Sequence, residues 1–175
     1  MWMRRQDFDA VVANHGRKVH TLAVYLLADR EEAQDVTQEV LVRLWRRGSE
    51  VVPEKIGPWL VRVTRNACID AIRRRKGGSQ VVSDDNVGID LHEPAPGPER
   101  LAHASQLGGR ILQALETLSE PGRSAVILRE IQGLSYQEIG EALEMSMSSV
   151  RVTLHRGRRK LREELKEVHD HVAVC

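Results

Sequence analysis

Apolar residues recur along the chain at steps of three and four, the spacing of one face of an α-helix. The clearest stripe consists of Ala33, Val36, Val40, Leu41 and Leu44. Asp29 stands before it as a candidate N-cap, with Glu32 at the capping-box position. The pattern predicts a helix that begins after Asp29 and ends near Arg47 and Gly48.

Two further helices are predicted in the first half of the chain. One covers roughly Phe8 to Leu27. The segment from Arg47 to Pro58 contains two glycines and two prolines, so it must be a loop or broken turn. Pro58 suits the first turn of a helix that continues to Arg75. We expect these helices to form one small domain, residues 1–76.

Residues 77–98 show neither a helical nor a strand period. They hold four glycines, three prolines and four acids, and no lysine or arginine. We therefore expect a flexible acidic linker. Helical periodicity resumes near Glu99, is interrupted at Ser119 to Gly122, and continues from Arg123 to Ile131. The prediction is an all-α protein of two small helical domains, the second being residues 99–175.

The segment after Gly133 carries the strongest local signal. Ser135 and Glu138 fit a capping box at the start of a short helix, and Ser146 can cap a second helix after a tight turn. The small Gly140 suits a close approach between the two helices. Glu144 occupies a turn position often held by glycine, which requires either an uncommon backbone angle or a slightly altered turn. Together these features predict a helix-turn-helix.

The second of these helices is expected to expose a basic surface. Early residues on it can reach base edges and later ones can bind phosphates. The candidate DNA-binding residues are Ser149, Arg151, Val152, His155, Arg156, Arg158 and Arg159. The alternative is an ordinary αα-hairpin with a basic outer face.

Charge supports nucleic acid as a partner although the formal net charge is only +1. Residues 62–76 hold six bases and one acid, and residues 151–162 hold six bases and no acid. Such concentrated stripes suit phosphate backbones, the alternative being two solvated helix faces. No apolar stretch is long enough to span a bilayer, so we expect a cytoplasmic protein without membrane insertion.

Other chemistry finds little support in the sequence. Gly-rich phosphate loops and nucleophile elbows are absent, so we expect neither an enzyme nor a cofactor. Cys68 and Cys175 form no disulfide framework. His169, His171 and Cys175 resemble a metal ligand set, but we expect no metal site there. A signal-sensing DNA-binding regulator is the main rival, although residues 1–76 lack the alternating strands of a receiver domain.

Three ordered segments resemble the extracytoplasmic-function (ECF, group IV) bacterial RNA polymerase sigma factors. Residues 29–45 resemble the region 2 helix that docks on the β′ coiled coil of core polymerase. Residues 58–76 are similar to the helix that engages the minus-ten element. The segment from Leu118 to Arg151 resembles region 4, which reads the minus-thirty-five element.

The resemblance implies roles for residues whose exposure follows from the helical pattern. Core polymerase, with its β′ and β subunits, is an implied partner, and its β′ coiled coil would bind the polar face formed by Asp35, Gln38 and Glu39. Promoter DNA, double-stranded and then melted, would contact Arg62, Arg65, Asn66 and Arg73. An anti-sigma factor is a further implied partner. Trp45 and Trp59 are expected to pack in the core or at a domain edge and not to stack on bases. Neither the inducing signal nor the promoter sequence follows from the chain.

Overall fold

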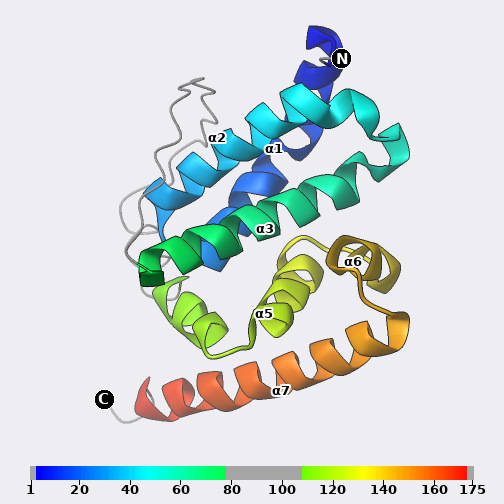
Figure 1. The fold of residues 1–175 in the computed structure, drawn as a ribbon. Helices are drawn as coiled ribbons and strands as arrows, with labels where there is room; N and C mark the ends of the chain where they lie inside the picture. Colours follow the sequence, from blue (N-terminus) through cyan, green and yellow to red (C-terminus); the bar gives the residue numbers. More distant parts are fainter. Residues whose placement is uncertain (1–2, 78–107, 173–175) are drawn as a thin grey trace. The chain divides into compact units, whose positions relative to one another are not determined.

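A computed structural model describes residues 3–77 and 108–172 (Figure 1). Within these residues every regular element is helical, which confirms the all-α prediction. The chain divides into two compact units, residues 1–92 and 93–175. Most of the expected linker, residues 77–98, lies outside the described residues. The linker and the exact domain limits therefore remain predictions.

The first unit is built from three helices, α1 (Arg5–Leu27), α2 (Arg30–Arg47) and α3 (Ile56–Gly77). Each helix packs against the other two (Figure 1). The predicted α2 stripe is buried throughout, and it meets the apolar faces of α1 and α3. Burial of one Leu side chain stabilises the fold by roughly 1.5–3 kcal/mol. The fully buried side chains of this core include Leu22, Val40, Leu44, Leu60 and Cys68.

The turn between α1 and α2 fixes the start of α2. Ala28 adopts a left-handed conformation with φ 54°. The Asp29 carboxylate accepts a hydrogen bond from the Glu32 N–H at 3.0 Å, which confirms Asp29 as the N-cap. Glu32 does not complete the predicted capping box, because its carboxylate forms an ion pair with Arg75 near the end of α3. This pair joins the start of α2 to the end of α3.

Two short 3₁₀ turns connect α2 to α3, η1 (Gly48–Glu50) and η2 (Pro53–Lys55). The broken turn predicted from the glycines and prolines is therefore present, and Pro58 lies in the first turn of α3. The Met3 N–H donates to the Trp45 carbonyl at 3.1 Å. The rings of Phe8 and Trp45 pack edge to face, with 5.2 Å between their centroids. Trp45 thus packs within the first unit, as expected.

The second unit begins, in the described residues, with a helical segment at 108–116. It continues with α5 (Glu120–Val126), a π-helical turn η3 (Ile127–Ile131), α6 (Tyr136–Leu143) and α7 (Met147–Val172). The break between the two helices lies at residues 117–119, so the interruption expected from Ser119 to Gly122 is placed too late in the chain. Pro121 occupies the first turn of α5, where its missing N–H is not needed.

Candidate nucleic-acid interface

The capping box at the start of α6 is present as predicted. The Ser135 hydroxyl accepts a hydrogen bond from the Glu138 N–H at 3.2 Å, and the Glu138 carboxylate accepts one from the Ser135 N–H at 2.7 Å. Two of the backbone N–H groups that lack an intrahelical partner at this helix end are thereby satisfied. Ile139, Ala142 and Leu143 face the core, so α6 is anchored along one side.

The turn between α6 and α7 bears on the predictions made for Gly140 and Glu144. Glu144 adopts the left-handed conformation, with φ 55° and ψ 43°, at the position that favours glycine. The Met145 carbonyl oxygen would lie 2.9 Å from a Cβ at Gly140, and Cγ2 of Val150 would lie 3.8 Å from it. Gly140 therefore allows a close approach, and it is the turn backbone that comes nearest. The helix-turn-helix is confirmed, with Glu144 in the uncommon backbone conformation.

Ser146 caps α7, again as predicted. Its hydroxyl accepts a hydrogen bond from the Ser149 N–H at 3.2 Å. The same hydroxyl lies 3.0 Å from that of Ser148 and 2.8 Å from that of Ser149. Val150 and Leu154 are fully buried, which orients α7 about its axis. The opposite side of the helix is consequently turned outward.

Most of the predicted DNA-binding residues lie on this outward side of α7. Val152 is 48% exposed although it is apolar. The other exposed members are Ser149, Arg151, His155, Arg156 and Arg159. Surface-exposed guanidinium, imidazole and hydroxyl groups beside an apolar side chain suit the mixed chemistry of base edges.

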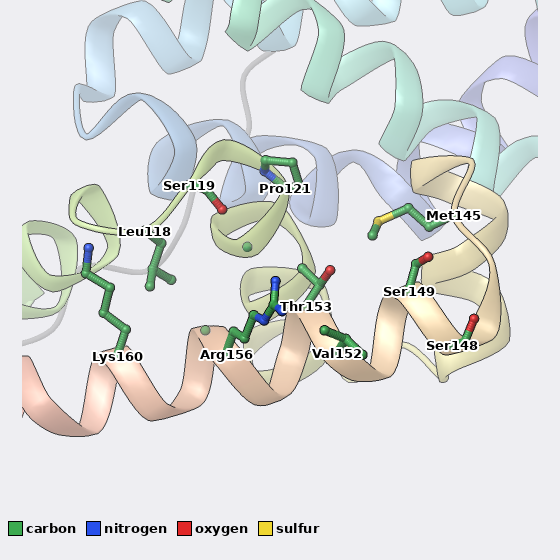
Figure 2. A pocket seen from close by; sticks show the side chains of 12 residues that line it. Leu118, Ser119, Pro121, Met145, Ser148, Ser149, Val152, Thr153, Arg156 and Lys160 are labelled. Carbon is green, nitrogen blue, oxygen red and sulfur yellow. The ribbon is translucent and has the colours of Figure 1, made fainter.

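A groove of about 610 Å³ runs along one flank of this surface (Figure 2). One wall is α7 and the other is the segment from Leu118 to Gly122, with Met145 at the turn. Figure 2 shows Arg156 and Lys160 extending from α7 on the side of this groove. The Lys160 ammonium is held by the Thr117 carbonyl oxygen. No carboxylate lines the groove among the described residues, so its charged lining is cationic.

Arg158 is placed differently from the residues around it. Its guanidinium is hydrogen-bonded to Glu130 and to the Tyr136 hydroxyl, and its pKa is raised, chiefly by the Glu130 bond. Arg159 remains outward, 3.8 Å from the Glu163 carboxylate. The sequence pattern grouped both arginines together, because no local signal marks a contact 28 residues away.

The polar face of α2 presents its three predicted residues unequally. Asp35 is exposed, and Gln38 is half-buried. Glu39 is also half-buried, and its carboxylate forms an ion pair with Arg43 one turn later. Asp35 is therefore the most accessible of the three acceptors.

The predicted face of α3 also divides by exposure. Asn66 and Arg73 are exposed, whereas Arg62 and Arg65 are half-buried. Arg73 lies 3.7 Å from the Asp70 carboxylate. The buried side of α3 includes Thr64, whose hydroxyl donates to the Leu60 carbonyl at 2.7 Å. Asn66 thus presents its amide on the side of α3 that faces away from this core.

Neither a metal cluster nor a membrane-spanning helix occurs in the described part of the chain. The possible metal ligands His169, His171 and Cys175 have side chains that lie outside the described part of the chain.

Comparison with known proteins assigns families to both units. A model described as "Sigma-70 region 2" matches residues 11–77, and one described as "Sigma-70, region 4" matches residues 108–161. The first range covers α2, α3 and most of α1. The second covers the groove, the helix-turn-helix and the exposed face of α7.

Curated relatives match along nearly the whole chain. The ECF RNA polymerase sigma factor SigE of Mycolicibacterium smegmatis is 36% identical over 91% of this chain, which spans 62% of SigE. SigW of Bacillus subtilis, also an ECF sigma factor, is 29% identical, with 95% of this chain and 94% of SigW covered. The sigma factor CarQ of Myxococcus xanthus is 30% identical, with 95% and 93% covered.

Solved structures show the same fold at lower identity. CnrH in complex with the cytosolic domain of CnrY has a TM-score of 0.71 and 22% identity, covering 94% of this chain and 90% of that chain. The sigma factor RpoE in complex with the anti-sigma factor NepR from Bartonella quintana has a TM-score of 0.69 and 20% identity, covering 92% and 98%. With both regions matched in order along one chain, this protein belongs to the ECF sigma factors of the sigma-70 family.

Proposed function

We propose that the chain binds core RNA polymerase and directs it to promoters by reading a minus-thirty-five and a minus-ten element. The observation that carries this proposal is the exposed face of α7, which presents arginines and Val152. The helix-turn-helix that holds this face is capped at both helix starts, and its apolar side is buried. Sigma factors direct promoter-specific initiation, and the two family regions occur here in one chain.

The upstream element is assigned to α7. Arg151 stands in the first turn and a half of that helix, where a guanidinium in the major groove can bond two acceptors of guanine. Val152 can contact the methyl group of thymine. Arg156 and Arg159 lie on later turns, where backbone phosphates are the expected ligands.

The downstream element is assigned to α3. Asn66 is exposed on α3. Two arginines of the same helix lie on either side of it in the sequence, the half-buried Arg62 and the exposed Arg73. An amide can bond the edge of a base that has left the stack, and arginines nearby favour the phosphates of the melted strand. We assign strand capture to Asn66 and backbone contacts to the surrounding arginines.

Core polymerase is assigned to the polar face of α2, with Asp35 as its most exposed acceptor. Carboxylates pair well with basic side chains on a partner and steer its association. An anti-sigma factor is a further proposed partner, since RpoE was solved with one. Copurification from the native host, followed by identification of the bound protein, tests that proposal.

Run-off transcription with core polymerase tests the function as a whole. The full chain should start transcription at one position on a promoter recovered from host DNA by the holoenzyme. Base changes in either element should reduce that product, whereas changes in the spacer of unchanged length should not. A chain that binds the promoter tightly without core, and adds no start site with it, would instead be a DNA-binding regulator.

A further inference from the structure

The Arg158 side chain joins α7 to two other elements of its unit. Its Nε and Nη2 donate to Oε1 of Glu130 at 2.8 and 2.6 Å, and its Nη1 donates to the Tyr136 hydroxyl at 3.4 Å. Glu130 lies in η3, and Tyr136 is the first residue of α6. These bonds use three of the five N–H donors of the Arg158 guanidinium. One side chain thus links η3, α6 and α7.

Tyr136 is held from a second direction. The Arg129 guanidinium lies 5.2 Å from the centroid of the Tyr136 ring, close enough for a cation–π contact. Nη1 of Arg129 also donates to the Leu134 carbonyl at 2.7 Å, which fixes the loop before α6. A network in which each member has a partner restrains its elements more than isolated surface pairs do.

The charge of Arg158 is already matched inside the protein. Its two bonds to the Glu130 carboxylate form an ion pair of zero net charge, so a DNA phosphate would compete with that carboxylate for the guanidinium. Arg159 offers the contrast, because its side chain is 67% exposed against 37% for Arg158. Its acid neighbour, Glu163, is 3.8 Å away on the same helix. Of these two arginines, Arg159 is the better phosphate ligand.

Arg158 also influences the direction in which the Arg151 side chain projects from α7. The two residues are seven positions apart, close to two turns of helix, and therefore project from the same side of α7. Tying that side to η3 and α6 sets the rotation of α7 about its axis. We propose that Arg158 is a positioning residue that orients the base-reading side of α7 and does not itself bind phosphate. This inference rests on the proposed function.

Holoenzyme reconstituted from core polymerase and each full-length variant tests the assignment. Two DNA probes are used, a promoter recovered with the wild-type holoenzyme and the same fragment with its upstream element replaced by unrelated sequence. Affinity for both is measured over a range of salt concentrations. The ratio of the two affinities reports base reading, and the slope of log affinity against log salt counts phosphate contacts.

Arg158→Ala should lower the affinity ratio by about tenfold and leave the salt slope unchanged, because it loosens a helix without removing a phosphate contact. Arg159→Ala, the matched control, should keep the ratio and reduce the slope by about one. The reverse result for Arg158→Ala, a reduced slope with an unchanged ratio, would make it a phosphate ligand and overturn the assignment.

Glu130→Gln separates the two roles without touching α7. A positioning role predicts a fall in the ratio similar to that of Arg158→Ala, and a double variant no worse than either single one. A phosphate-binding role predicts the opposite, since a released guanidinium would raise affinity for both probes. That rise would overturn the proposal.

Arg158→Lys serves if the alanine variant fails to fold, as judged by circular dichroism. The ammonium keeps the charge but not the forked geometry that reaches both partners. The ratio should fall by about threefold at an unchanged slope, and a wild-type ratio would contradict positioning. Equal affinity of the wild-type holoenzyme for both probes is a different failure, because it would overturn the proposed function and this inference with it.

Discussion

Gly157 of α7 packs directly against Val126 of α5, so closely that a Cβ at Gly157 would lie 2.8 Å from Cγ2 of Val126. Val126 is 3% exposed and β-branched, so it has neither space nor rotamer freedom to yield. The missing side chain therefore lets α7 approach α5 along the groove wall. The crossing of α7 over α5 depends on this contact.

Gly157→Val should destabilise the second unit by about 1–3 kcal/mol, because overpacking in a closed core forces backbone shifts. Thermal unfolding followed by circular dichroism measures the change. Gly109→Ala is the matched control, since nothing lies within 4 Å of a Cβ there and alanine is the better helix former. Equal melting temperatures for Gly157→Val and the wild type would contradict the close crossing.

Asp35→Arg should abolish binding to core polymerase while leaving the fold intact. Asp35 is exposed on α2, so reversing its charge changes the partner surface and not the core. Glu39 is a poorer test because it is half-buried and paired with Arg43. Asp9→Arg, on an exposed position of α1, is the control. Gel filtration with core polymerase distinguishes them, and unchanged association of Asp35→Arg would remove the docking claim.

Local signals in the sequence located most of the elements and caps. Apolar spacing gave α2 within a residue at its start, and Ser135, Glu138 and Ser146 marked both helix starts of the helix-turn-helix correctly. These features depend on residues a few positions apart. The pattern also favoured Gly140 as a close contact for the same reason, since the turn that approaches it follows immediately.

Contacts between distant residues could not be predicted in this way. The Glu32 pair with Arg75, the Arg158 bonds to Glu130 and the Gly157 contact with Val126 each join different helices. Their formation depends on how the helices pack against one another. The periodicity of residues within one helix carries no information about that packing. The sequence therefore marked the exposed arginines as a group, and only the fold separates those that are already paired.

Cys68 should resist alkylation in the folded protein. Burial, with a smaller contribution from the charge of Glu39, raises the pKa of its thiol to about 12. Since the thiolate is the reactive form, iodoacetamide at pH 9 should label native Cys68 about a thousandfold more slowly than unfolded Cys68. A Cys175→Ser background isolates the signal. Rapid native labelling would show that α3 is not packed as described.

The same shift fixes the sign of a pH effect. The folded pKa lies above the unfolded value, so the stability that protonated Cys68 contributes is complete below about pH 8.5. It is lost as the pH rises from there towards about 12. Cys68→Ala removes this loss, and its unfolding curve should therefore depend less on pH in that alkaline range. Parallel slopes for both proteins would contradict the burial of the thiol.

The last prediction separates promoter binding from promoter melting. Asn66 is exposed on α3, and its amide can bond a base edge only after that base leaves the stack. Asn66→Ala should therefore leave closed-complex affinity unchanged and reduce the fraction of open complex by about tenfold, the effect of losing roughly 1.4 kcal/mol.

Permanganate footprinting measures this, because it modifies thymines only where strands are separated. On a linear promoter, Asn66→Ala should show weak reactivity around the minus-ten element. On a bubble template already melted there, thymine reactivity gives no information, so binding affinity is compared instead. The variant should bind the bubble more weakly than the wild type, since the base it fails to hold is already unstacked. Asn14→Ala, the same change at an exposed asparagine of α1, is the control and should match the wild type on both templates. Wild-type melting of the linear promoter by Asn66→Ala would show that α3 does not capture the minus-ten strand through this residue.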